Sequence, residues 1–414
     1  MCEREPVTNV TKKIPPEIWV LISAAFIIAL GYGLIAPIIP QFARSFDVSM
    51  AAASAVVSIF SFSRLVFAPL SGKLIDFLGT RKVYVTGLIT VGTTTAGVSL
   101  VQHYGQIILL RGIAGIGSTM FTVSAMALII RLAPTDIRGR CSSMYASAFL
   151  IGNIIGPLLG AALSGLGMRW PFFIYGVGVL CAALVVTLKM PRRIGAKPVT
   201  NTPQPPMRFR EAFRDPAYRC ALLSAFSTGW SNFGVRVAIL PLFAAAIFRH
   251  DGAIAGLAMA AFALGNAVCL QFSGRLSDNI GRRPLLIAGL AMNALFSGVL
   301  GLAHHVWSVL LLSALSGAGS GIYNPAQQAV IADVVGADRS GGKVLANFQM
   351  AQDFGSILGP LVVGAIAEWV GFGWGFGICG MVSLFSLSCW IVGGRETLPA
   401  LTQQSSCAGV SCRR

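Results

Sequence analysis

The chain has 414 residues, of which 55% are hydrophobic and only 11% are charged. Soluble domains carry about 25% charged residues, so these charges are too few to cover a water-soluble globule, and we expect lipid to cover part of the surface. The formal net charge of +16 would suggest nucleic acid in a soluble protein. Here we assign the basic residues to cytoplasmic loops, where they attract anionic lipid headgroups, and expect no nucleic-acid partner.

A membrane span needs about 20 apolar residues, and twelve candidates follow one another along the chain. The first six are 17–40, 49–71, 82–102, 105–130, 141–165 and 170–190. The second six are 219–248, 252–273, 284–303, 306–332, 344–368 and 371–393. The predicted fold class is therefore an all-α membrane protein of twelve transmembrane helices in two pseudo-symmetric six-helix bundles.

Basic residues precede the odd-numbered spans, while the opposite loops hold only Arg44, Arg169 and Arg249. Cytoplasmic loops retain Lys and Arg, so both termini are predicted to lie inside, and we expect a multi-pass protein of the inner (plasma) membrane. The predicted parts are an N-terminal bundle (1–190), a Pro-rich basic cytoplasmic linker (191–218), a C-terminal bundle (219–395) and a disordered cytoplasmic tail (396–414). The segment 207–218 could form a short interfacial helix with Phe209 and Phe213 on one face.

The two halves repeat each other. The segment from Gly72 to Lys82 follows the second span, and a similar segment from Gly274 to Pro284 follows the eighth, at an offset of 274 − 72 = 202. The pattern Gly152-x-x-x-Gly156-Pro157-x-x-Gly160 has a counterpart that starts at Gly355, at an offset of 355 − 152 = 203. Two motifs at nearly one offset, both starting inside, indicate a parallel repeat.

These motifs resemble those of the major facilitator superfamily. The repeated loop G-x-L-x-D-x-x-G-x-R-[KR] is the hallmark of that family. There it latches the two halves in one state and lets go in the other. The alternative is a solvated loop whose charges set topology. Leu78 and Thr80 depart from the family's commoner basic residues. The residues that the resemblance assigns to the latch are Gly72, Asp76, Gly79, Arg81, Gly274, Asp278, Gly281 and Arg282.

Gly152, Gly156, Pro157 and Gly160 resemble the motif that marks antiporters in this superfamily, although Ala161 replaces the family's final glycine. Glycines at four-residue spacing allow close helix contact, and ordinary small-residue packing is the alternative. The pattern Leu30-Gly31 to Pro40 in the first span is similar to that of twelve-span drug:proton antiporters. The resemblance therefore implies a proton-coupled exporter.

Charged residues inside predicted spans are costly and mark sites. Asp353 is the one acid well inside a predicted span, near the midplane, and is our proposed proton carrier; a packing pair with Arg236 or Gln349 is the alternative. Arg111 heads a pattern that resembles the family's proton-transfer motif, with Ala114 as a departure; a buried arginine satisfied by carbonyls is the alternative. Arg236, the third candidate for proton coupling, could pair with Asp353 or meet an anionic substrate. Arg64, near the inner end of its span, is interpreted as snorkelling to the interface.

The resemblance implies a substrate cavity lined by the first, fourth, seventh and tenth spans. Polar and aromatic candidates there are Tyr32, Trp230, Asn232, Asn266, Tyr323, Asn324 and Gln327. Each is an ordinary packing residue in the alternative interpretation. The resemblance implies small-molecule substrates and protons as partners, the apolar composition predicts membrane lipid, and the implied fold is that of a monomer.

The exporter has two alternatives. One is proton-linked transport of a sugar or endogenous metabolite. The other is a membrane enzyme or receptor, which the sequence disfavours. It has no H-E-x-x-H or G-x-S-x-G pattern, its nine cysteines form no C-x-x-C pair, and its four histidines all fall in predicted outer loops. We therefore expect no enzyme activity, no catalytic residue, no metal site and no cofactor.

Overall fold

The computed structural model describes residues 14–133, 138–190, 207, 209–248, 253–336 and 342–398, and these residues form helices and short connections without any strand. The N-terminal helices are α1 (Pro16–Ile35), α2 (Ile39–Arg44), α3 (Met50–Leu78), α4 (Thr80–Val98), α5 (Tyr104–Leu132), α6 (Arg138–Ala162) and α7 (Trp170–Lys189), with a short turn η2 (Ser164–Leu166) before α7. Residues 191–206 of the predicted linker and residues 399–414 of the predicted tail lie outside the described residues.

The C-terminal half begins with the short helix α8 (Phe209–Arg214). One long span then consists of α9 (Pro216–Thr228), a π-helical stretch η3 (Gly229–Val235) and α10 (Arg236–Ile247). The remaining helices are α11 (Ala253–Ile280), α12 (Arg282–Gly298), the turn η4 (Leu300–Leu302), α13 (Val306–Val335), α14 (Gly342–Trp369) and α15 (Phe372–Val392). Both aromatic side chains of α8, Phe209 and Phe213, are exposed, and their ring centroids lie 5.4 Å apart on one face of the helix.

Eleven segments of the described chain are long and apolar enough to cross a membrane. The predicted span 82–102 corresponds to α4, which is not among the eleven: six of its 19 residues are threonines, and Arg81 and Lys82 lie in its first turn. This helix nevertheless packs along α5 and α7 inside the first bundle. We therefore keep α4 as a predicted span, which brings the predicted total to twelve.

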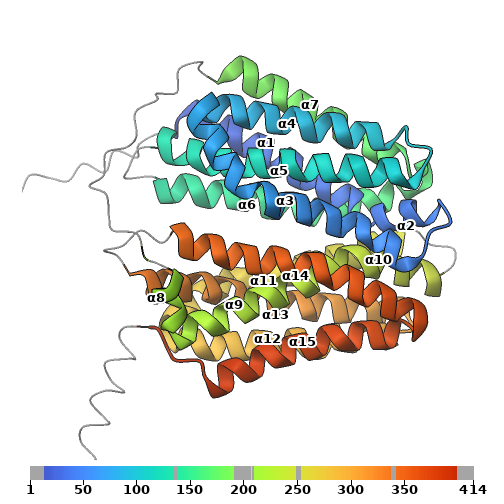
Figure 1. Ribbon diagram of the computed structural model, residues 1–414. Coiled ribbons are helices and arrows are strands. Elements are labelled where there is room, and N and C mark those ends of the chain that lie inside the picture. The colour runs from blue at the N-terminus through green and yellow to red at the C-terminus, as the bar shows by residue number, and fades with distance from the viewer. Residues whose placement is uncertain are drawn as a thin grey trace, which may run out of the picture.

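The helices form two bundles that lie side by side, α1 and α3–α7 in one and α9–α15 in the other (Figure 1). The bundles meet where α3 packs on α14 and α6 packs on α11. Ser58 donates a hydrogen bond to the Ile357 carbonyl at 2.7 Å across the first of these contacts. A Cβ built on Gly256 would lie 2.6 Å from the Pro157 carbonyl oxygen across the second. Together with a contact between α2 and α10, these crossings close the side that we predict to be outside.

The predicted repeat is visible in matching contacts of the two bundles. A Cβ added to Gly33 would lie 2.8 Å from Pro157 Cδ, and one added to Gly234 would lie 2.8 Å from Pro360 Cδ. Arg81 donates to the carbonyl of Thr187 at the end of α7 at 2.6 Å. Its counterpart Arg283 donates to the Trp390 and Ile391 carbonyls at the end of α15, at 3.1 and 2.7 Å.

The prediction that the repeated motif forms a loop is wrong except at one residue. Helix α3 continues to Leu78 and α11 continues to Ile280, and the next helix begins directly after Gly79 or Gly281. These two glycines have φ values of 86° and 113°, a region that is essentially restricted to glycine. A single left-handed residue is enough to end one helix and start the next, so the polar motif residues before it stay helical.

Replacement of Gly281 by Ala is expected to lower the free energy of unfolding by about 1–3 kcal/mol through backbone strain. Space is not the cause, because a Cβ at Gly281 meets no heavy atom within 4 Å. Gly274→Ala is the matched control, since that helical glycine is equally uncrowded. Thermal unfolding of the purified protein in detergent measures both. Equal melting temperatures for the two variants would contradict the strain argument.

Candidate substrate cavity

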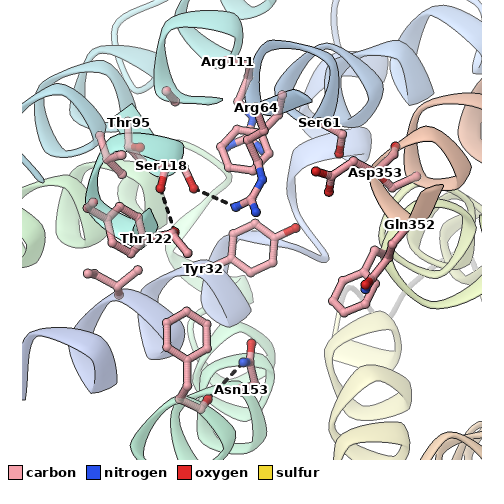
Figure 2. Close-up of a pocket in the computed structure, with 18 of the residues that line it drawn as sticks. Tyr32, Ser61, Arg64, Thr95, Arg111, Ser118, Thr122, Asn153, Gln352 and Asp353 are labelled. Carbon is pink, nitrogen blue, oxygen red and sulfur yellow. Dashed lines mark hydrogen bonds between the residues drawn. The ribbon is translucent and has the colours of Figure 1, made fainter. Parts of the chain in front are cut away.

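A cavity of about 320 Å³ lies between the two bundles, and its size is that of a site for a drug-sized molecule. Most of its described lining comes from the first bundle, and α14 and η3 supply the rest. Six of the lining residues are aromatic: Tyr32, Phe60, Phe121, Phe149, Tyr175 and Phe233. The polar and charged lining residues are Ser61, Arg64, Thr95, Arg111, Ser118, Thr122, Asn153, Gln349, Gln352, Asp353 and Ser356. Figure 2 shows ten of the lining residues labelled around the central space.

Arg111, on α5, is the most deeply buried cation of the cavity, with 4% of its surface exposed. Its guanidinium carbon lies 4.3 Å from the centroid of the Phe60 ring, a distance typical of a cation–π contact. Within the described part of the chain its Nε has no hydrogen-bond acceptor, and no carboxylate lies within ion-pair distance. A positive charge is thus held against the cavity without a protein anion.

Arg64 lies next to Arg111, and its interpretation as a snorkelling residue is not supported. Helix α3 extends to Leu78, so Arg64 is well inside the helix and lines the cavity. Its Nη1 donates to Ser118 Oγ at 3.0 Å, as Figure 2 shows. The Arg64 guanidinium carbon lies 6.0 Å from the same Phe60 ring centroid. Two cations therefore flank one aromatic ring on the wall formed by α3 and α5.

Asp353 supplies the one carboxylate among the described residues that line the cavity. It projects from α14 toward the space near Ser61, opposite the Arg64 and Tyr32 side (Figure 2). Gln349, one turn earlier, donates to Asp353 Oδ1 at 3.4 Å, which is a weak hydrogen bond. The cavity thus has a cationic wall in the first bundle and an acidic wall in the second.

Of the predicted cavity residues, only Tyr32 lines this space. Asn232 is buried and donates to Ser320 Oγ and Tyr323 Oη, both at 2.9 Å. Gln327 is also buried, and its Nε2 approaches Thr228 Oγ1 at 3.5 Å. These side chains form a polar network inside the second bundle. No residue of α13 is among those described as lining the cavity, so its lining differs from the symmetric set of spans that the resemblance implies.

The remaining candidates lie in the second bundle as well. Trp230 is buried, with its ring centroid 5.7 Å from that of Phe226. Asn266 and Asn324 are partly buried. The backbone of Asn266 lies close to α13, because a Cβ on Gly321 would be 2.3 Å from the Asn266 carbonyl oxygen. None of these three residues lines the 320 Å³ cavity.

Arg236 is separate from Asp353. It lines a different space of about 10 Å³ inside the second bundle, and 5% of its surface is exposed. Its Nη2 donates to Ser316 Oγ at 2.8 Å, and its guanidinium carbon lies 3.7 Å from the Phe262 ring centroid. Among the ion pairs of the described residues there is none between Arg236 and Asp353.

The second copy of the repeated motif forms a charged cluster. Arg282 Nη1 lies 2.5 Å from Asp278 Oδ1, and its Nε lies 3.4 Å from Asp333 Oδ2. The Glu396 carboxylate accepts from the backbone N–H groups of Arg282 and Arg283 at 2.9 and 3.0 Å, which places an anion at the N-terminus of α12. In the first copy, the side chain of Asp76 lies outside the described part of the structure.

The glycines of the predicted antiporter motif lie against α1. A Cβ at Gly152 would lie 2.8 Å from Leu30 N, one at Gly156 2.4 Å from the Leu30 carbonyl oxygen, and one at Gly160 2.6 Å from the Leu34 carbonyl oxygen. Only glycine permits this approach of two backbones. The contact fixes the position of α1, and with it that of Tyr32 in the cavity wall.

Two bundles of apolar helices around a shared central cavity define a multi-pass membrane transporter. The family model described as Major Facilitator Superfamily matches residues 21–250 and again 221–406. The chain therefore belongs to the major facilitator superfamily, and it is a transporter, not an enzyme.

Sequence similarity to known proteins extends over most of the chain. The chain is 27% identical over 377 residues to the class C tetracycline resistance protein of Escherichia coli, covering 86% of this chain and 92% of that one. It is 23% identical over 364 residues to Multidrug resistance protein 2 of Bacillus subtilis strain 168, covering 84% and 88%. A bacterial homologue of the human lysosomal transporter Spinster, solved in an inward-facing and occupied conformation, superposes with a TM-score of 0.74 at 14% identity, over 91% of this chain and 96% of that chain. The last likeness concerns the fold alone.

Proposed function

We propose that this protein is a proton-coupled secondary transporter that exports small, partly apolar compounds by alternating access. The observation that carries the proposal is the 320 Å³ cavity at the seam of the two bundles, with six aromatic lining residues and a single described carboxylate, Asp353. The names of the tetracycline and multidrug resistance relatives support export of such compounds.

Asp353 is the proposed proton carrier. It lies on α14, and Ile357, one turn further along this helix, accepts the hydrogen bond from Ser58 of the other bundle. An ionised carboxylate held away from water is costly unless a cation or a proton neutralises it. The protonation state of Asp353 therefore acts where the bundles meet. A ligand can shift the balance of facing states only by interacting differently with each, and this position allows both proton and substrate to do so.

The repeated motif at the predicted cytoplasmic end is the proposed latch between facing states. Arg81 and Arg283 each connect the motif to the last helix of their own bundle, so a bundle can move as one body. The proposal includes Asp76, Asp278 and Arg282 as the charges that form and release contacts between bundles. It also places both termini in the cytoplasm and has the monomer as the working unit.

The proposal is tested by transport in proteoliposomes with a lumen at pH 6 and an outer buffer at pH 7. We expect uptake of at least one member of a panel of lipophilic cations, zwitterions and neutral aromatic drugs, with proton release that matches the uptake. Exchange of one proton for one substrate over one pH unit sustains about a tenfold concentration ratio. Uptake that is unaffected by the direction of the pH gradient would overturn proton coupling.

A further inference from the structure

Arg111 is a buried cation that faces a ligand-sized cavity without an anionic partner in the described structure. Its exposure is 4%, its Nε has no acceptor, and its one close neighbour of opposite electrostatic character is the face of Phe60 at 4.3 Å. A buried ion without a hydrogen-bonded counter-charge is strongly unfavourable. The planar guanidinium presents two parallel N–H groups, which match a carboxylate. The geometry is therefore that of a binding site for an anionic group.

Arg64 strengthens the positive character of the same wall. One of its guanidinium nitrogens, Nη1, donates to Ser118 Oγ, and its guanidinium flanks the Phe60 ring on which Arg111 also lies. Tyr32 and Tyr175 line the cavity with these arginines and add hydroxyl groups to the wall. An anionic group placed here would meet two cations, and its aromatic neighbours would cover the rest of the molecule.

Asp353 on the opposite wall restricts the substrate further. An anion alone would bind better once a proton had neutralised Asp353, and it would then travel with the proton. Exchange requires a substrate that competes with the proton, and a basic amine facing the ionised carboxylate does so. The groups that face Asp353 across the cavity are Arg64 and Arg111 on the first bundle, with Gln349 on its own helix.

We infer that the preferred substrates are zwitterionic amphiphiles, whose carboxylate pairs with Arg111, whose aromatic body lies on the wall around Phe60, and whose amine faces Asp353. The anion site is defined by Arg111 independently of any gradient. The role of the amine rests on the proposed function, since it follows from competition with the proton.

Equilibrium binding to the purified full-length protein in detergent, without a gradient, tests the anion site. The probes are norfloxacin, which carries a carboxylate and an amine on an aromatic body, and its ethyl ester, which keeps only the amine. Hydrogen bonds to a charged group predict that the acid binds about 10- to 100-fold more tightly than the ester. Arg111→Gln should remove that preference by weakening acid binding alone, and Arg111→Lys should restore part of it.

The ester also reports on folding, because a folded Arg111→Gln protein still binds it. Arg236→Gln is the matched control: it removes a second buried arginine that lies over a phenylalanine but outside the cavity, and it should leave the acid-to-ester ratio unchanged. Equal affinities for acid and ester in the wild type, binding of neither, or an equal loss of both in Arg111→Gln would overturn the inference. Tighter binding of the acid without any pH-driven transport would support the anion site and contradict the proposed function. pH-driven transport of the ester alone would support the proposed function and contradict the anion site.

Discussion

Asp353→Asn is expected to abolish pH-driven accumulation of substrate, whereas gradient-free exchange at saturating substrate should persist. Asparagine keeps the size of the side chain and one acceptor oxygen, but it cannot lose or gain a proton. In the proteoliposome assay the steady-state ratio should fall from about tenfold per pH unit to about one. Counterflow of labelled against unlabelled substrate at equal pH on both sides needs no proton and should persist.

Two further variants make the test specific. Asp353→Glu retains an ionisable group and should recover part of the gradient-driven ratio. Gln349→Ala removes the weak hydrogen bond to Asp353 Oδ1 without removing the carboxylate, and it should preserve coupling. An Asn variant that still builds a gradient-dependent ratio would show that another group carries the proton, and loss of counterflow in the same variant would indicate damage to the cavity instead.

The membrane spans could be predicted because hydropathy measures how apolar a segment is, and a segment in contact with lipid must be apolar. The predicted span 170–190 corresponds to α7, Trp170–Lys189. The predicted second span ends at residue 71, whereas the helix that contains it, α3, continues to Leu78. Lys73 ends the apolar run but does not end the helix, because a charged side chain at the membrane surface is compatible with helical backbone hydrogen bonds. The position where the helix does end, Gly79, is set by backbone conformation.

The residues of the cavity could be predicted mainly where they are charged, because charged residues are rare in an apolar sequence. Asp353 and Arg111 stand out because charges inside spans are costly. Phe60, Thr95, Asn153 and Tyr175 carry no such signal, since their positions in the cavity depend on how each helix is rotated in its bundle. The two-fold repeat also suggests equal contributions from both halves, whereas most described lining residues belong to the first bundle. In the second bundle, Asn232 donates a hydrogen bond to Tyr323, and neither residue lines the cavity.

Gly156→Ala is expected to destabilise the protein by about 1–3 kcal/mol or more, the range for an overpacked interior. The added Cβ would lie 2.4 Å from the Leu30 carbonyl oxygen, 2.8 Å from Gly33 Cα and 3.0 Å from the Gly33 carbonyl carbon. All three are backbone atoms, which cannot rotate aside as a side chain would, so α1 and α6 must separate. Because α1 holds Tyr32 in the cavity wall, we expect substrate binding to weaken together with stability.

Gly178→Ala is the matched control for this prediction. Gly178 lies on α7, which also packs on α1, but its added Cβ would meet only Ile27 Cγ2, at an ordinary 3.7 Å. The control should therefore retain the melting temperature and substrate affinity of the wild type. If Gly156→Ala matches it in both measurements, the close approach of α1 and α6 is not what holds the cavity wall. If Gly156→Ala is destabilised while its affinity is unchanged, the contact supports the bundle but does not position Tyr32.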